Sequence, residues 1–154
     1  MSLTPVWHLL HLAGVVVWVG GMHFAHMCLR PAAAELLEPP ARLRLLRRIF
    51  DRFLPWVAVA IGAVLASGGA MFSRALDGTT PHAALSVMAF AGLAMTVVFL
   101  RIRFAPYPAL CRAVDAEDWK LAGVRMATIR QLVLLNLMVG WFTIIVATVG
   151  RLAG

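Results

Sequence analysis

The sequence predicts an all-α membrane protein, an antiparallel bundle of four transmembrane helices formed by a single domain of 154 residues. Three observations predict this fold. Hydrophobic residues make up 62% of the chain and charged residues only 14%, against roughly 45–50% and 25% in soluble domains. Four stretches lack Lys, Arg, Asp and Glu, and each is close to the roughly 20 residues that cross about 30 Å of hydrocarbon. Their Leu, Ala and Val content favours helices over the strands of a barrel.

The four predicted spans cover residues 6–29, 54–73, 83–100 and 131–150. The first span has no basic segment before it and ends in Arg30-Pro31 without a small-residue cleavage site. It is therefore predicted to remain in the protein as a helix and not to be removed as a signal peptide.

The distribution of Lys and Arg predicts the orientation. Twelve of the fourteen basic residues lie in the connections between spans one and two and between spans three and four, while the opposite side has only Arg74 and Arg151. Cytoplasmic loops carry the excess of Lys and Arg. Both connections are thus predicted to be cytoplasmic, with both termini and the loop at residues 76–81 outside, in a bacterial inner membrane. The basic composition then reflects topology and indicates no nucleic-acid partner.

The connections contain helices of their own. After Pro39-Pro40, residues 41–53 place apolar side chains on one face and arginines opposite, which predicts an amphipathic helix lying at anionic lipid headgroups. A second short helix is expected to restart near Asp115 and to lead into the fourth span. Within the spans, Gly14 and Gly21 are one heptad apart, and Gly62, Ala66 and Ala70 form a small-residue pattern typical of close helix packing.

Histidines are the main ionisable residues inside the spans, where such groups are costly and mark candidate sites. Counted at 100° per residue, the four histidines of the first span share a sector of roughly 120°. His11 and His82, on different helices at a similar outer depth, are predicted to ligate haem b, with His8 as a neighbour. Trp18, Arg130 and Asn136 are the other candidates for this site, Arg130 for a haem propionate. The alternative is that these histidines lie at a wet interface or form hydrogen bonds within the bundle.

A second cluster lies at the other end of the first span. Met22 and His26, like His23 and Met27, are four residues apart, and His23 and His26 are three apart, so these side chains can converge on a helix. Imidazole and thioether groups, with the nearby Cys28, form a soft set that suits copper, above all Cu(I). The alternative is plain packing, because methionine fills apolar interiors well.

The stretch His11 to Met22, HLAGVVVWVGGM, resembles the first-helix signature of small CopD-family membrane proteins. Shorter stretches at residues 28–33, 104–107, 118–119 and 129–137 are also similar to that family. The first helix is similar in addition to HemJ, a haem-linked protoporphyrinogen oxidase. The CopD resemblance implies copper uptake or resistance, and the HemJ resemblance implies haem b held by His11 and His82. His23 and His26 stand where relatives have aromatic residues, and Arg101 stands where relatives often carry histidine.

Three functions follow as hypotheses. The first is an inner-membrane haem b protein in electron transfer or membrane redox chemistry, with a quinone or a redox protein as electron partner. The second is a copper-binding or copper-trafficking protein without haem. The third is a structural or assembly protein without a cofactor. The HemJ resemblance implies a membrane oxidoreductase, but no residue pattern in the sequence indicates a catalytic base, a nucleophile or a phosphate loop.

Overall fold

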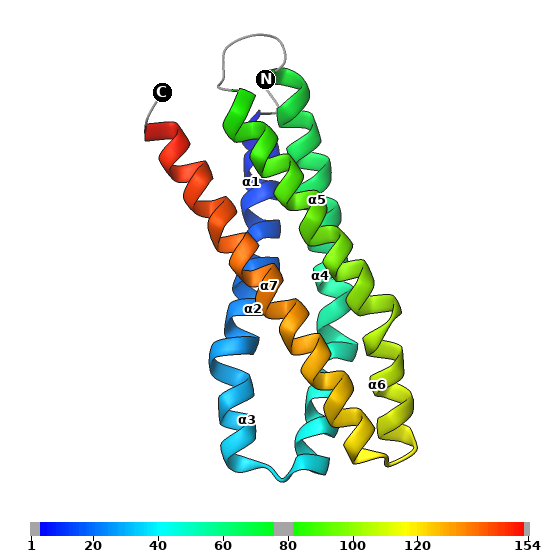
Figure 1. Cartoon of the computed structure of the whole chain (residues 1–154). Coiled ribbons are helices and arrows are strands. Elements are labelled where there is room, and N and C mark those ends of the chain that lie inside the picture. Colours follow the sequence, from blue (N-terminus) through cyan, green and yellow to red (C-terminus); the bar gives the residue numbers. More distant parts are fainter. Residues whose placement is uncertain (1–3, 76–81, 153–154) are drawn as a thin grey trace.

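The computed structural model describes residues 4–75 and 82–152, apart from the side chains at positions 82, 83 and 150–152. The described residues form helices joined by short turns, without a strand (Figure 1). Four helical segments are long and apolar enough to cross a membrane: Thr4–Leu36, Pro39–Ala75, Ala84–Asp115 and Trp119–Val149. They cover the four predicted spans to within one residue at an end, which confirms the predicted fold class. The loop predicted at residues 76–81 lies outside the described residues.

The first span is one continuous rod with two irregular turns. It comprises α1 (Thr4–Val15), the π-helical segment η1 (Val16–Gly20), α2 (Gly21–Phe24), the π-helical segment η2 (Ala25–Leu29) and α3 (Arg30–Leu36). Hydrogen bonds in a π-helical turn reach one residue further than in an α-helix, so each such turn holds an extra residue. The angular positions predicted for His23 and His26 from a regular helix therefore do not apply.

The second span is longer than predicted. The first rod ends where Leu37 turns extended, two residues before Pro39, and α4 then runs from Pro39 to Ala75. Residues 41–53, predicted as a separate amphipathic helix, are the first part of α4. Pro55 lies inside this helix without ending it. Leu43 and Leu46 are buried by neighbouring helices, so this apolar face packs against the protein.

The third and fourth spans are joined by a short helical hairpin. Helix α5 (His82–Phe104) ends before Pro106, and α6 (Pro106–Asp115) continues in the same general direction. The chain reverses at Ala116–Asp118, where Glu117 has a positive φ of 54°, and α7 runs over Trp119–Leu152. The Asp118 carboxylate accepts a hydrogen bond of 2.9 Å from the Leu121 N–H and so caps α7. The helix thus restarts at Trp119 and not near Asp115 as predicted.

Two helix pairs form the bundle. Helix α1 packs along α4, α5 packs along α7, and α6 packs on the first part of α7. Gly14 allows the α1–α4 contact, because a Cβ there would stand 2.9 Å from the Ala60 carbonyl oxygen. Gly62 has no atom within 4 Å of a Cβ position, so the predicted small-residue pattern does not form this interface.

Helix α1 begins and α7 ends at the same end of the bundle (Figure 1). The opposite end, where α3 meets α4 and α6 meets α7, is called the basic end here because it contains the two arginine-rich connections. Which end faces the cytoplasm stays a prediction.

Candidate functional site

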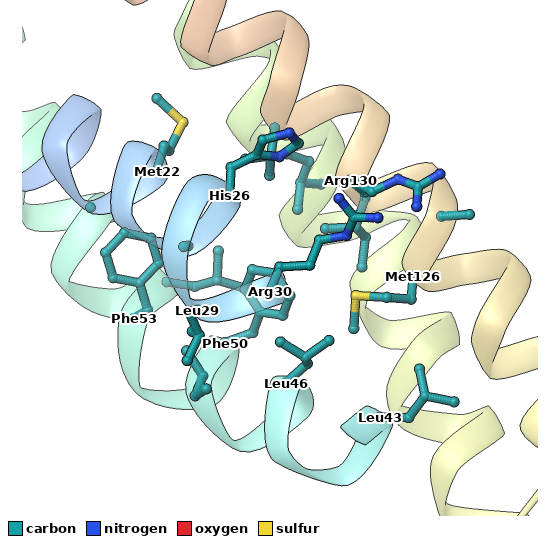
Figure 2. A pocket seen from close by; sticks show the side chains of 18 of the residues that line it. Met22, His26, Leu29, Arg30, Leu43, Leu46, Phe50, Phe53, Met126 and Arg130 are labelled. Carbon is teal, nitrogen blue, oxygen red and sulfur yellow. The ribbon is translucent and has the colours of Figure 1, made fainter. Parts of the chain in front are cut away.

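A cavity lies toward the basic end, between the second half of the first rod, the first half of α4, and α7. Its volume is about 510 Å³, within the range of small-molecule and cofactor sites. Figure 2 shows its side chains from close by. The walls are mostly apolar and include Trp18, Leu43, Leu46, Phe50, Phe53 and Leu54. The cavity is therefore a place for a largely apolar ligand.

Three arginines from three helices line the cavity: Arg30 from α3, Arg42 from α4 and Arg130 from α7. Arg30 lies within electrostatic range of the other two, and Figure 2 shows Arg30 next to Arg130. In the described parts of the chain, no carboxylate lies within ion-pair distance of these three residues. The cavity thus combines apolar walls with a concentration of unpaired positive charge.

Two other arginines of the basic end, Arg44 and Arg47, have acidic partners. The Arg44 guanidinium donates to the Glu117 carboxylate at 2.7 Å and lies over the Trp119 ring. Arg47 pairs with Asp115. Acidic side chains at this end are thus used for pairing, but not on the arginines of the cavity.

Soft metal-binding donors also line the cavity. Met22 from α2, His26 from η2 and Met126 from α7 all contribute to its walls (Figure 2). Met22 is 5% exposed, and its sulfur accepts a hydrogen bond of 3.7 Å from the Asn136 side-chain amide. The Asn136 side-chain oxygen is buried and has no hydrogen-bond partner. Two thioethers and one imidazole therefore surround a single, mostly apolar space.

The structure divides the four residues predicted to bind copper. Met22 and His26 line the cavity, whereas the His23 ring packs edge-on against Trp141 at 5.7 Å between ring centres. His23 Nδ1 is buried without a partner, Met27 is 58% exposed, and Cys28 is exposed. Among the described residues, no group of three or more His, Cys, Asp and Glu side chains is close enough to hold a metal ion. Any copper site at this cavity would need thioether ligands.

His11 lies nearer the other end and faces α4. The buried Ser67 hydroxyl donates to the Ala63 carbonyl oxygen at 2.5 Å and lies 3.0 Å from His11 Nδ1. With Nδ1 protonated, the His11 imidazole donates to the Ser67 oxygen, and Nε2 is left as a ligand or acceptor. His11 is thus tied to α4.

The remaining residues of the predicted haem site are spread over the molecule. Trp18, Arg130 and Asn136 line the cavity together with His26. His8 uses Nδ1 to donate to the Thr4 carbonyl oxygen at 2.8 Å, within its own helix. His82 begins α5, but its side chain lies outside the described residues, so its pairing with His11 stays a prediction.

Sequence reasoning missed Arg30, Arg42 and Met126 as site residues. Arg30 follows His26 by four residues, but the stretch between them lies in the π-helical segment η2, so the spacing rule of a regular α-helix did not indicate their common site. Arg42 and Met126 reach the cavity only through the tertiary packing of α4 and α7 against the first rod, which no local pattern indicates.

A protein-family model matches the chain, whereas comparisons with curated proteins and with solved structures found no match. The matching family is described as Copper resistance protein D, and its model covers residues 47–149. This range is about two thirds of the chain and includes most of α4 and all of α5 and α6. It is the family that the sequence resembles, although the matched range begins after the first span. The chain belongs to the copper resistance protein D (CopD) family.

Proposed function

We propose that this membrane protein handles copper by binding Cu(I) at the cavity, through the Met22 and Met126 thioethers and the His26 imidazole. The observation that carries the proposal is that these three soft donors, from separate segments, line one cavity. Soft thioether ligands select Cu(I), and imidazole suits copper as well. Membership of the copper resistance protein D family supports the same metal.

The donor set fits Cu(I) in chemistry; Met22 is buried, and His26 and Met126 are half-buried. Met22 is almost fully buried and its sulfur faces the Asn136 amide, so a Cu(I) ion there would be shielded from water. The charge near His26 opposes the fit, because Arg30 and Arg130 lie within electrostatic range of this imidazole. Binding of a cation should therefore be strengthened when an anion neutralises these arginines.

Titration of the purified protein with Cu(I) against a competing chromophoric chelator tests the proposal. Met22→Leu and His26→Ala should each weaken Cu(I) binding by about tenfold or more, the order of effect expected when a ligating group is lost. Met27→Leu is the matched control, because this thioether is exposed and should not contribute. Equal affinities for the Met22→Leu and Met27→Leu proteins would rule out the cavity as the copper site.

A second candidate function is haem b binding near the other end of the bundle, with a role in electron transfer to or from a quinone or a redox protein. The observation that favours it is the bond between His11 and Ser67. A ligating histidine usually donates its other ring N–H to a fixed partner, which sets the tautomer and the ring orientation. With Nδ1 protonated, His11 would meet this requirement through Ser67, and the second iron ligand would be His82.

A visible spectrum of protein from haem-replete cells distinguishes the two functions. Haem binding predicts a Soret band that is lost in His11→Ala and retained in His8→Ala, whose imidazole bonds only to its own helix. A protein that binds Cu(I) but shows no Soret band supports copper handling alone. A Soret band that survives His11→Ala contradicts the second candidate.

We also propose that the basic end faces the cytoplasm of a bacterial inner membrane, with both termini outside. The support is the excess of Lys and Arg in the two connections of that end. Cysteine labelling from the two sides of the membrane tests it, with single cysteines at exposed positions 44 and 120 in a variant that lacks the native thiols. Labelling from the periplasmic side would contradict the proposed orientation.

A further inference from the structure

We propose that the cavity binds one anionic phospholipid of the surrounding membrane. In this site the lipid phosphate lies between Arg30, Arg42 and Arg130, and an acyl chain follows the apolar lining that continues into the spans toward Trp18 and Val57. The proposal does not depend on copper or haem binding.

The unpaired arginines are the first argument. Like charges repel, and the repulsion is stronger beside apolar walls than in open water. Arg30 is half-buried and lies within electrostatic range of Arg42 and Arg130, yet no described carboxylate pairs with any of them. Arg44 and Arg47, at the same end of the bundle, each have a carboxylate partner. What distinguishes these three from the other unpaired arginines of this end is that they line one mostly apolar cavity. A phosphate there could accept several charge-assisted hydrogen bonds from their guanidinium groups.

The shape of the cavity is the second argument, and it separates a lipid from a free phosphate. On the first rod, residues that line the cavity extend from Arg30 to Trp18, about 18 Å along a helix. One leaflet is about half of the roughly 30 Å of hydrocarbon in a bilayer, so this wall is long enough for an acyl chain. Leu54 and Val57 of α4 also line the cavity. A free phosphate would leave these apolar walls without a partner.

The third argument is the order of the arginines and the apolar lining along the bundle. Arg30 and Arg130 are adjacent to the predicted spans at residues 6–29 and 131–150, and Arg42 lies nearer the basic end. The lining continues from there into the spans, as far as Trp18 and Val57. A lipid in the adjacent leaflet has its phosphate and acyl chains in the same order. Basic pockets between transmembrane helices are known sites for acidic headgroups.

Native mass spectrometry of the protein from nanodiscs of phosphatidylglycerol and phosphatidylcholine tests the proposal. The wild-type protein should retain one phosphatidylglycerol molecule in preference to phosphatidylcholine. The double variant Arg30→Gln, Arg130→Gln should reduce this retention by about tenfold or more. Its matched control is Arg101→Gln, Lys120→Gln, which removes the same charge from exposed residues of the basic end that do not line the cavity.

A second pair of variants tests the acyl-chain part without changing charge. Gly123 lines the cavity, and a Cβ there meets no atom within 4 Å. Gly123→Leu should therefore fill the space and expel the lipid without forcing the helices apart. Gly92→Leu is the control, because Gly92 is equally open but does not line the cavity. Thermal unfolding of all variants shows whether each one is folded.

Three results would overturn the proposal. The first is equal retention of the two lipids by the wild-type protein. The second is retention of phosphatidylglycerol by the folded Arg30→Gln, Arg130→Gln protein at the level of its control. The third is a porphyrin or a quinone in the cavity in place of the phospholipid. Loss of Cu(I) binding with retained lipid would contradict the proposed copper function alone.

Discussion

Replacing Gly14 by alanine should separate α1 from α4 and destabilise the protein. The added Cβ would stand 2.7 Å from Val64 Cγ2 and 2.9 Å from the Ala60 carbonyl oxygen. Val64 can rotate its methyl group away, but the carbonyl oxygen belongs to the helix backbone and moves only with α4. Extra atoms in a well-packed interior cost about 1–3 kcal/mol. The higher helix propensity of alanine returns at most about 1 kcal/mol, so we expect a net loss of about 1–2 kcal/mol.

The same substitution at two other glycines provides the controls. At Gly62 a Cβ meets nothing within 4 Å, so Gly62→Ala should be neutral or slightly stabilising. At Gly21 a Cβ would stand 2.5 Å from the far end of the Phe53 ring. Because this ring borders the cavity, it has room to move, and Gly21→Ala should cost less than Gly14→Ala.

Reversible unfolding in detergent, measured as the free energy of unfolding, should rank the three variants as Gly62→Ala, Gly21→Ala and Gly14→Ala, from most to least stable. A Gly14→Ala protein as stable as Gly62→Ala would refute the close α1–α4 contact. The position of His11 against Ser67, one turn before Gly14, would then be in doubt as well.

The same unfolding assay checks three further changes. Tyr107→Phe removes the hydroxyl that donates to the Asp51 carboxylate and should cost about 1–2 kcal/mol; no loss would show that this bond is not maintained. Asn136→Leu removes a buried oxygen without a partner and only one weak bond to sulfur, so stability should stay within about 0.5 kcal/mol or increase. Ser67→Ala leaves His11 without its interhelical partner and should cost about 0.6 kcal/mol, the average for such bonds in membranes. A loss several times larger would mean that Ser67 has a further role.

The spans could be predicted because a bilayer leaves few alternatives. Backbone groups in hydrocarbon must be paired within the segment, so length and apolar composition suffice to identify a transmembrane helix. They do not determine where the helix ends. Residues 41–53 have a different composition from the second span, yet α4 continues through both parts and through Pro55. The composition of a segment indicates the environment of a helix and not the residue at which the helix ends. Leu43 and Leu46 are buried because they pack against other helices.

The candidate site could be predicted only in part. The spacing of Met22 and His26 on one helix indicated two donors that do line the cavity. The number of arginines in each connection predicts the orientation in the membrane. The proposed anion site depends instead on which arginines line the cavity and have no carboxylate partner. That distinction appears only when α3, α4 and α7 are placed together, because the carboxylates of Asp115 and Glu117 come from the distant α6–α7 turn.

The π-helical segments were not predicted. Their backbone hydrogen bonds join residues five apart instead of four, and neither the composition nor the spacing of apolar residues indicates this change. The residues next to η1 have ordinary helical dihedrals, with φ and ψ of −62° and −44° at Val15 and −63° and −42° at Gly21. Each segment adds a residue without ending the helix. As a result, the second half of the first rod is rotated about the helix axis relative to its position in a regular α-helix. The direction in which each side chain after Gly20 points changes accordingly.

Deleting one residue from η1 tests this account of the first rod. A π-helical turn holds about one residue more than an α-helical turn, so removal of Val17 should let the segment close into a regular turn without rotating α2. The contact of Met22 with Asn136 would then be kept, and so would the cavity.

Deletion of Ala58, in the regular part of α4, would instead rotate one part of that helix against the other by about 100° and misplace Leu46 or Ser67. Both deleted residues are exposed, so direct loss of packing is small in each case. The Val17 deletion should therefore retain most of the free energy of unfolding and the Ala58 deletion should lose several kcal/mol; equal losses would show that η1 does not absorb an extra residue.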